Sequence, residues 1–458
     1  MSFFLFLIYV VLNYVYPAEI FPVLAPLRIT HWVGIAALGL CAVWLAFRRT
    51  SPLATIQFWF VLALMATLVV SRIVGERWLG AVVPALTQFG PSLTMFMLAL
   101  CAVDSIKKLR IAAGLIGVLS LILVAQGVAA YHFGYNAKMF VFDPVTRAEY
   151  VAAPDGSTDD AGDDATADSD EADYDSDIDS GSTLVRIRGL GLLHDPNDLA
   201  LGLVMALPLI GAFWRRRAML RNLAVVVLPA CAIGYGLFLT RSRGGVLALA
   251  VTLCAAASRR IGRIPALLIF ALVFGAGLTA DFASGRQLSL ADDSATGRME
   301  AWSEGLQMLK SQPLLGVGYG QFLDHHTLTA HNSFVLCFAE AGLIGYFFWL
   351  GIIVITVVQL QHLKKLPPDE PLTRELRHWA PALQLALIAF MTAAFFLSRS
   401  FIPMLYLLTG LCVALVLIAR DANKPVWSPS APRVGTLVLA CEIASILFIY
   451  AVMKVYRA

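Results

Sequence analysis

Long apolar segments recur along the whole chain, separated by short polar stretches. A helix needs about 20 mainly apolar residues to cross a bilayer, because in hydrocarbon every backbone amide must be bonded within its own segment. Thirteen segments approach that length, although the first and the eighth are short, and they cover residues 2–17, 29–47, 53–71, 79–103, 111–131, 197–213, 222–239, 244–257, 263–280, 332–360, 379–398, 401–419 and 434–453. The pattern predicts an all-α, polytopic bundle of about 12–13 transmembrane helices, with a large external loop that contains short amphipathic helices.

The composition agrees with a membrane protein. Of 458 residues, 59% are hydrophobic and 14% are charged, whereas a soluble domain has about 45–50% apolar and about 25% charged residues. An ordinary soluble enzyme and a disordered chain are both excluded. The cysteines lie in apolar runs without metal-ligand or redox spacing, so we expect them to be buried packing residues: Cys41, Cys101, Cys231, Cys254, Cys337, Cys412 and Cys441.

The net charge of +3 hides one strongly acidic segment. Residues 155–179 hold twelve acidic and no basic side chains, which leaves 34 basic and 19 acidic residues in the rest of the chain. The segment is of low complexity and has almost no apolar residue to offset the entropy of ordering it. We expect residues 155–181 to be a disordered external insertion. Its carboxylates offer at most a weak divalent-cation site, since no fixed cage would hold them.

The basic residues predict the orientation of the helices. If the chain starts in the cytoplasm, the short loops that face inward contain most of the loop arginines and lysines, as the positive-inside rule requires: Arg48, Arg49, Lys107, Lys108, Arg110, Arg215–Arg217, Arg221, Arg259, Arg260, Arg263, Lys364, Lys365 and Arg420. The first helix is expected to be retained, because no basic residue precedes it and no cleavage site follows.

This orientation divides the chain into five parts, of which two are external. The predicted parts are N-terminal transmembrane helices (1–131), an external loop with the acidic insertion (132–196), central transmembrane helices (197–280), a second external loop (281–331) and C-terminal transmembrane helices (332–458). Functional residues should be sought in the two external loops.

Two arginines lie in a short external hairpin, LTRSRGGV. Gly244 and Gly245 would let the backbone turn tightly there, which places the guanidinium groups of Arg241 and Arg243 at the headgroup level. Interfacial anchoring by snorkelling is the alternative interpretation of both arginines.

The second external loop contains a predicted amphipathic helix from Arg298 to Leu309. Trp302 follows Arg298 by one turn, and further apolar residues continue the same side. Such a helix would lie in the interface rather than cross the membrane. Its alternative role is to cover the bundle, with Arg298 stacked on Trp302.

His331 directly precedes a long apolar helix that Asn332 or Ser333 can cap. The positive end of that helix favours an anion and disfavours protonation of a neighbouring imidazole, which suits His331 to act as a neutral base. The alternative is a histidine used only in packing. A zinc site at His325 and His326 is weakly supported, and Glu340 falls on the opposite side of the helix, where we expect it to bond a neighbouring helix.

Gly316, Gly318 and Gly320 form a GVGYG segment that resembles two known motifs only superficially. A dinucleotide fingerprint requires a preceding strand and a different final spacing. A potassium-channel filter requires an apolar pore helix, but charged residues such as Arg298 and Lys310 precede this segment.

External guanidinium groups, a helix N-terminus and a histidine together suit a lipid-borne diphosphate. Arginine binds phosphate oxygens bidentately and stabilises charge on a leaving diphosphate, and a neutral histidine can remove a proton from an acceptor hydroxyl.

At this point the sequence resembles the bacterial O-antigen ligase and O-antigen polymerase superfamily. The similarity covers about residues 185–360 and rests on five ordered blocks: GLLHDPNDLALGLVMALPL at 191–209, SRGG at 242–245, R-x3-W at 298–302, PLLGVGYGQF at 313–322 and HNSFVLCFAEAGLIG at 331–345. The resemblance implies a membrane glycosyltransferase of lipopolysaccharide biosynthesis, in the bacterial inner membrane, with its active site on the periplasmic side. It implies an undecaprenyl-diphosphate-linked glycan as donor, membrane lipids as surroundings, and neither a metal, a cofactor nor a nucleic acid.

The resemblance also implies roles for individual residues. Arg243 and Arg298 would hold the diphosphate and His331 would activate the acceptor hydroxyl. Residues that would assist in binding the diphosphate or the glycan are Arg241, Arg186, Arg188, His194 and Asn332.

The acceptor is left open by these blocks. A ligase transfers the glycan to lipid A-core, a polymerase transfers it to a second lipid-linked repeat, and a third relative transfers it to a protein Ser or Thr. Ligation to lipid A-core is slightly favoured, although the acidic insertion and the thirteenth helix depart from the family pattern. A lipid transporter is the alternative from another class, but it would place charges near the bilayer midplane, where only Glu340 and Glu442 clearly lie.

Overall fold

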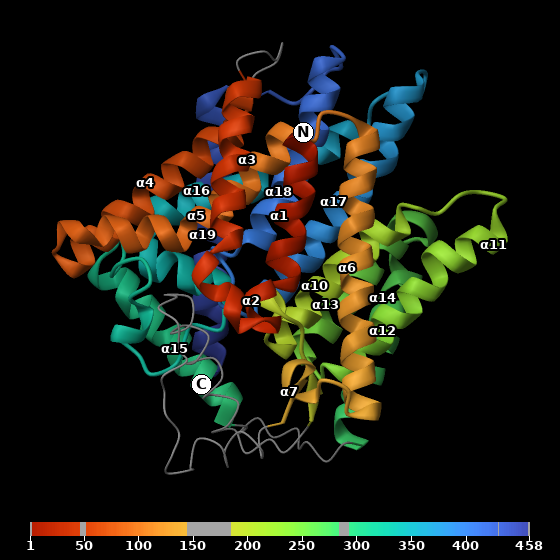
Figure 1. The fold of residues 1–458 in the computed structure, drawn as a ribbon. Coiled ribbons are helices and arrows are strands. Elements are labelled where there is room, and N and C mark those ends of the chain that lie inside the picture. The colour runs from red at the N-terminus through yellow and green to blue at the C-terminus, as the bar shows by residue number, and fades with distance from the viewer. Residues whose placement is uncertain (1, 46–51, 144–184, 284–292, 429, 457–458) are drawn as a thin grey trace.

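A computed structural model of the chain describes residues 2–45, 52–143, 185–283, 293–428 and 430–456. The predicted all-α polytopic bundle is confirmed, because long helices run up and down the molecule in succession (Figure 1). The acidic insertion and the pair Arg48–Arg49 lie outside the described residues.

Thirteen helices of the described chain correspond to the thirteen predicted spans. They are α1 (Ser2–Val15), α3 (Ile29–Leu45), α4 (Ile56–Glu76), α5 (Val82–Ala102), α6 (Ile106–Phe133), α10 (Pro196–Gly211), α12 (Leu228–Leu239), α13 (Arg243–Ile261), α14 (Arg263–Ala283), α16 (Ser333–Leu363), α17 (Pro371–Ala394), α18 (Pro403–Asp421) and α19 (Ala431–Tyr456).

Nine of the spans in the described residues are long and apolar enough to cross a membrane, and α1, α10 and the first part of α14 are shorter apolar helices. The remaining helix, α17, begins with the charged turn PLTRELRH, which explains its weaker apolar signal.

Shorter elements connect these helices. They are the helices α2 (Pro17–Ile20), α7 (Ala137–Phe140), α11 (Met219–Asn222) and α15 (Asp293–Ser311), the 3-10 helices η1 (Pro22–Leu27), η2 (Pro52–Ala54), η3 (Leu79–Ala81), η4 (Gly191–Leu193) and η6 (Phe322–Asp324), and the π-helical η5 (Leu223–Val227). The strands β1 (Val141–Phe142) and β2 (Arg186–Ile187) pair antiparallel, with Val141 opposite Ile187 and Phe142 opposite Arg186.

The two ends of the bundle differ. The N-terminus lies at the upper end in Figure 1, whereas α2, α7, α15 and the C-terminus lie at the lower end. We call the lower end, which also includes the β1–β2 pair and the start of α16, the site end. We call the upper end the basic end, because the loops after α5, α10, α16 and α18 meet there and are rich in arginine and lysine.

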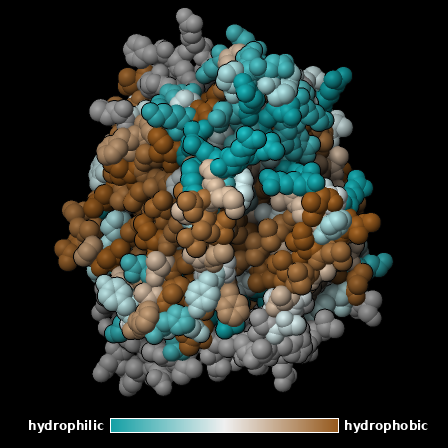
Figure 2. Space-filling model, turned by 90° about the vertical axis from the view of Figure 1, so that its right-hand side faces the viewer, coloured by the Kyte–Doolittle hydropathy of each residue, from teal (hydrophilic) through white to brown (hydrophobic). Residues whose placement is uncertain are grey.

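The surface between the ends is apolar. Figure 2 shows a broad hydrophobic belt across the middle of one face, with hydrophilic residues gathered above it. Large apolar side chains are exposed along the helices, for example Leu267, Leu268 and Leu272 of α14. A lipid-facing surface accounts for this exposure, so the chain is a multi-pass membrane protein.

The interior is built around α18, whose side chains from Pro403 to Ala419 are all buried. Aromatic rings of other helices pack edge to face against it, such as Phe89 of α5 on Tyr406 at a centroid distance of 5.1 Å. Four cysteines are buried as predicted, but the prediction is wrong for Cys231, which is exposed. Because an apolar thiol is compatible with lipid, burial is not required at that position.

Helix α16 is broken at Gly342, and the glycine-rich loop fills the break. Gly342 has φ 63° and ψ −169°, a backbone conformation that glycine adopts readily. Leu343 N donates to Pro313 O at 2.8 Å, and Val317 N donates to Ala339 O at 2.9 Å. Residues 313–318, which end in the first part of the GVGYG segment, therefore pair with α16 on both sides of the break.

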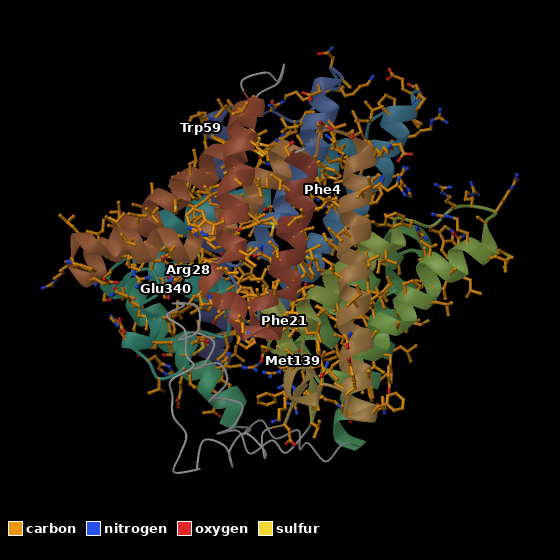
Figure 3. All side chains as sticks on the ribbon, in the orientation of Figure 1. Phe4, Phe21, Arg28, Trp59, Met139 and Glu340 are labelled. Carbon is orange, nitrogen blue, oxygen red and sulfur yellow. The ribbon has the colours of Figure 1, made fainter. Side chains whose placement is uncertain are left out.

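The side chain of Glu340 bonds the chain that follows this loop, whereas its backbone carbonyl bonds a neighbouring helix. The sequence prediction is therefore wrong for the side chain. Its Oε1 accepts from Phe322 N at 3.3 Å, and its carbonyl accepts from Ser71 Oγ of α4 at 2.6 Å. Glu340 lies well away from Met139, a residue of the site end (Figure 3). Its role in the described fold is to hold the glycine-rich loop against the broken helix.

Candidate active site

The hairpin between α12 and α13 presents Arg241 and Arg243 at the site end. Ser242 is the N-cap of α13, and its Oγ accepts from Gly245 N at 3.2 Å. Arg241 has φ 52°, so the left-handed turn residue is an arginine. The sequence prediction that Gly244 and Gly245 make the turn is wrong, because both glycines are helical residues of α13.

Gly245 has a different role, which is close packing. A Cβ atom at this position would lie 2.8 Å from Ala200 Cβ and 2.9 Å from Leu237 Cδ1. Only glycine therefore allows the first turn of α13 to lie against α10. The hairpin arginines are fixed relative to the start of α10 by this contact.

The two hairpin arginines have different surroundings. The guanidinium group of Arg241 lies 4.4 Å from the ring centroid of Phe238 in the last turn of α12, which is a cation–π contact. Arg243 is the first residue of α13 and is half-buried. Arg241 is therefore held beside an aromatic ring, whereas Arg243 lies in the first turn of a helix.

Arg186 connects the hairpin to two other segments. Its side chain is buried, its Nε donates to Thr240 O at 2.9 Å, and its Nη2 donates to Asn197 Oδ1 at 2.9 Å. Thr240 precedes the hairpin arginines, and Asn197 lies in the first turn of α10. The structure thus brings together β2, the hairpin and the start of α10.

Arg188 is bonded elsewhere at the site end. Its Nε donates to Met139 O at 3.0 Å, and its Nη2 donates to Lys138 O at 2.7 Å. Both carbonyls belong to α7, so these contacts hold α7 against the segment that follows β2.

His194 stands directly before the N-cap of α10. Its Nδ1 lies 3.0 Å from Gly191 O, and Asp195 caps the helix by accepting from Asn197 N at 2.6 Å. His194 is half-buried at the site end, and the two contacts fix the local turn that carries it.

His331 and Asn332 form the start of α16. Asn332 is fully buried, and its Oδ1 accepts from Phe334 N at 2.9 Å and from Val335 N at 3.2 Å, so the predicted cap is confirmed with Asn332 as the capping residue. The cap orients the buried Asn332 Nδ2 group, which has no hydrogen-bond partner among the described residues. His331 is 7% exposed and has φ 43°, a strained conformation for a non-glycine residue.

Arg298 lies on α15, which confirms the helix predicted from Arg298 to Leu309 and extends it at both ends. Trp302 packs edge to face on Phe395 at 5.3 Å between ring centroids, and Phe395 contacts Phe334 of α16 at 5.8 Å. A Cβ atom at Gly297 would lie 2.9 Å from Leu328 Cδ1. The helix that carries Arg298 is therefore packed against the segments on both sides of His331.

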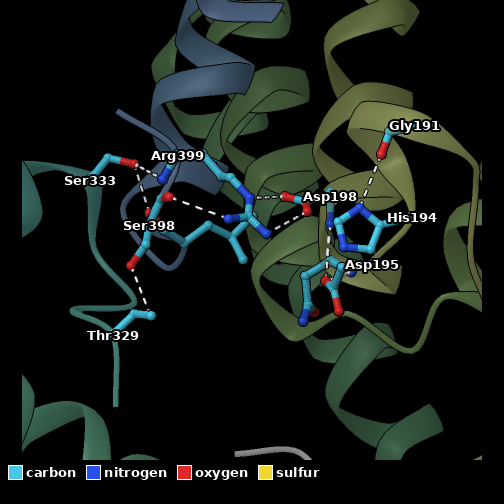
Figure 4. Close-up of polar contacts among 10 residues, drawn as sticks. Gly191, His194, Asp195, Asp198, Thr329, Ser333, Ser398 and Arg399 are labelled. Atoms are coloured by element: carbon cyan, nitrogen blue, oxygen red, sulfur yellow. Dashed lines mark hydrogen bonds and ion pairs between the residues drawn. The ribbon is translucent and has the colours of Figure 1, made fainter. Parts of the chain in front are cut away.

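The sequence analysis missed a buried ion pair between Arg399 and Asp198. Arg399 Nε donates to Asp198 Oδ1 at 2.6 Å and Nη2 donates to Oδ2 at 2.7 Å, and both side chains are almost fully buried (Figure 4). Asp198 lies inside the GLLHDPNDLA block, but Arg399 is 201 residues away. The only sequence signal is a charged residue between two apolar segments, and it does not indicate the partner.

The arrangement combines cationic groups, a helix N-terminus and a buried histidine at one end of the bundle. Guanidinium groups and free helix amides stabilise phosphate oxygens, and an imidazole can accept a proton. Within the described ranges, no three His, Cys, Asp or Glu side chains gather as a metal site.

Comparison with known families agrees with the resemblance found in the sequence. Residues 228–350 match the model of the family described as O-antigen ligase. This segment runs from α12 to the middle of α16, so it includes the hairpin, α15, the glycine-rich loop and His331. No curated protein matches the chain.

Proposed function

We propose, on the premise that residues 228–350 match the O-antigen ligase family model, that the protein transfers a glycan from undecaprenyl diphosphate to an acceptor hydroxyl. The transfer takes place at the site end, which faces the periplasm while the basic end faces the cytoplasm of the bacterial inner membrane. The acceptor is lipid A-core, so the reaction is O-antigen ligation.

One observation supports this proposal above the others. Segments far apart in the sequence meet at the site end through hydrogen bonds, since Arg186 joins the hairpin to α10 and Arg399 joins α10 to the start of α16. A transporter would instead place its charged residues near the bilayer midplane.

Each proposed residue has a distinct task. The acceptor oxygen attacks the anomeric carbon of the donor sugar, His331 takes the hydroxyl proton, and the bond from that carbon to the diphosphate oxygen breaks. The electron pair leaves with the diphosphate, and Arg243 and Arg298 stabilise its growing charge. Arg241, Arg186, Arg188, His194 and Asn332 contribute to binding of the diphosphate and the glycan.

The proposal is tested with purified protein in liposomes that contain undecaprenyl-diphosphate glycan and either lipid A-core or no second lipid. Glycan on lipid A-core supports the ligase function. Lengthened donor chains would replace it with a polymerase function, and the absence of any transfer, with or without added divalent metal, would overturn the proposed reaction.

His331→Ala tests the role of the histidine in the same assay. We expect a loss of transfer of at least about 100-fold, as is typical for a general base, while the donor still binds. His325→Ala is the control, because His325 is an exposed histidine of the same loop. Normal transfer by His331→Ala would contradict the base role.

A further inference from the structure

The loop between α17 and α18 binds the chain on both sides of His331. Ser398 Oγ donates to Thr329 Oγ1 at 3.0 Å, and Arg399 N donates to Ser333 Oγ at 2.9 Å. Ser400 Oγ donates to Ser333 O at 2.6 Å. Thr329 and Ser333 stand two residues before and two residues after His331, so the loop holds the histidine segment at both ends (Figure 4).

The same loop is anchored in the interior of the bundle. Trp349 Nε1 of α16 donates to Ser400 O at 2.9 Å, and Ser333 Oγ donates to Leu397 O at 2.7 Å. Ser333 and Ser400 are fully buried. Because buried polar groups of this loop are satisfied by fixed partners, its position is well determined.

The guanidinium group of Arg399 extends this anchoring to α10. Its two bonds to Asp198 are bidentate, the geometry that fixes both distance and orientation of an arginine and a carboxylate. Asp198 lies four residues after His194 and next to Asn197, the partner of Arg186. The positive charge of Arg399 is compensated by Asp198. In this respect Arg399 differs from an arginine whose charge would be compensated by a bound phosphate.

We propose that Arg399 and Asp198 are a positioning pair, which sets the place of His331 relative to the arginines carried by β2 and by the hairpin. The inference rests on the proposed function, since it assigns a task to residues that do not contact the reacting groups. A misplacement of about 1 Å in such a group can lower a rate by about 100-fold.

Arg399→Lys separates positioning from folding. Lysine keeps the positive charge beside Asp198 but cannot make the bidentate contact. We expect the variant to fold, with a size-exclusion profile like that of the wild type, and to lose about 10- to 100-fold in kcat for glycan transfer. The KM for the donor and the affinity for undecaprenyl diphosphate should stay unchanged. Ser398→Ala, which removes the contact to Thr329, should lower kcat in the same direction.

Arg110→Lys is the matched control at the basic end. Arg110 Nη2 contacts both carboxylate oxygens of Glu375 at 3.2 and 3.1 Å, and the change should leave kcat unaffected. A wild-type kcat for folded Arg399→Lys would overturn the positioning role, and a weaker donor affinity would overturn it in favour of direct donor binding. A wild-type protein without any transfer activity would instead overturn the proposed function itself.

An independent observation concerns the basic end, where two cations share one neutral acceptor. Arg259 Nη2 of α13 donates to Gln384 Oε1 at 3.0 Å, and Lys364 Nζ, just after α16, donates to the same oxygen. Gln384 lies on α17 and is 2% exposed. Three helices therefore bring two positive charges to one buried amide.

No carboxylate of the described residues compensates these charges. Other cations at this end do have acidic partners, such as Lys108 with Asp104 and Arg110 with Glu375. Desolvation, followed by the charges of Arg259 and Lys365, lowers the pKa of Lys364 to about 8. A pair of cations at a membrane surface without an acidic partner is suited to an anion.

We propose that Arg259 and Lys364 bind a phosphate group at the basic end, with Gln384 as the neutral residue that holds the two side chains together. This site lies at the end of the bundle opposite the catalytic residues. The occupant we infer is the headgroup of an anionic phospholipid, because Arg259 ends a helix whose surface is apolar and lipid-facing.

Thermal unfolding in detergent tests the site with three probes: dihexanoyl phosphatidylglycerol, dihexanoyl phosphatidylcholine and inorganic phosphate. We expect the anionic lipid alone to raise the Tm of the wild type by a few degrees, and the shift to disappear in Arg259→Gln and in Lys364→Gln. Arg260→Gln, at the exposed neighbouring arginine, is the control and should keep the shift. An equal effect of inorganic phosphate would overturn the lipid headgroup as occupant, and equal shifts in all variants would overturn the site.

Discussion

At the scale of the residue, Arg241 occupies a turn position whose backbone conformation is strained for arginine and would be unstrained for glycine. Its φ of 52° places an arginine in the left-handed region, which costs about 1–3 kcal/mol for a non-glycine residue. The guanidinium contact with Phe238 accompanies this conformation. A turn that keeps an arginine in spite of the strain is consistent with the proposed use of that side chain.

Two substitutions at Arg241 should separate strain from charge. Arg241→Gly should leave the Tm unchanged or raise it, whereas Arg241→Val should lower the free energy of unfolding by about 1 kcal/mol or more, because a β-branched residue is strongly disfavoured at positive φ. Both variants should bind the undecaprenyl-diphosphate donor more weakly. Equal stability of the two variants would show that the turn adapts, and unchanged donor affinity would remove Arg241 from the proposed site.

Lys364 provides a pH-dependent prediction at the basic end. Its pKa of about 8 lies below the ordinary lysine value, so the side chain loses its proton as the pH rises through about 8. Phosphate-group binding should therefore weaken between about pH 7 and pH 9, which a titration of the lipid-induced Tm shift would measure. Lys364→Arg stays charged and should bind equally at both pH values. If it loses binding like the wild type, Lys364 is not the titrating group.

At this scale, the sequence predicted interactions between residues that are close together in the chain. Asn332 could be predicted as a cap because a capping side chain bonds amides only two and three residues away. The ion pair between Arg399 and Asp198 could not, since it joins residues 201 positions apart and no local pattern indicates the partner. Arg241 was not predicted as the turn residue, because Gly244 and Gly245 follow shortly after it and glycine adopts a positive φ more readily than arginine.

At the scale of the element, the close contact of α13 with α10 depends on a glycine, Gly245, at the interface. Gly245→Ala should lower the free energy of unfolding by about 1–3 kcal/mol, the usual effect of overpacking, because the new Cβ would lie 2.8 Å from Ala200 Cβ. Gly234→Ala is the control in α12, where nothing lies within 4 Å of an added Cβ. That change should stabilise by about 0.5–1 kcal/mol. Similar Tm values for both variants would contradict the close contact.

The helices themselves were predicted well, because the requirement for bonded backbone in hydrocarbon leaves a strong apolar signal. The break at Gly342 was not predicted. The segment AGLIG reads as a continuous helix, and the bonds that replace the helical ones come from Pro313 and Leu314 of a distant loop. A glycine in an apolar helix does not by itself predict a break, so the break cannot be predicted unless the contact with that loop is known.

At the scale of the whole molecule, the two ends should be accessible from opposite sides of the membrane. Cysteines introduced at Lys138, an exposed residue of α7 at the site end, and at Arg216, an exposed residue after α10, test this arrangement in a background without native cysteines. An impermeant maleimide should label Lys138→Cys in intact spheroplasts and Arg216→Cys only after the membrane is opened. The reverse result would place the site end in the cytoplasm and contradict periplasmic transfer.

The sequence predicted the long helices of the described chain in their order, but not which of them form the interior. Helix α18 is no more apolar than several lipid-facing helices, and yet its side chains are all buried. In a bilayer, apolar residues suit both the interior and the lipid surface. Hydropathy therefore indicates which helices can cross the membrane, but not which helices pack together. The grouping of the site residues could not be predicted, because it depends on contacts between helices that are distant in the sequence.

The short β1–β2 ladder has a consequence for changes in chain length. It fixes Phe142 directly opposite Arg186, so the two ends of any loop between these residues are held side by side. The entropy of closing such a loop grows only slowly with its length, and so insertions and deletions there place little demand on the helices. We therefore expect that an insertion between β1 and β2, whether natural or a reporter domain added by design, lengthens the protein without moving Arg186.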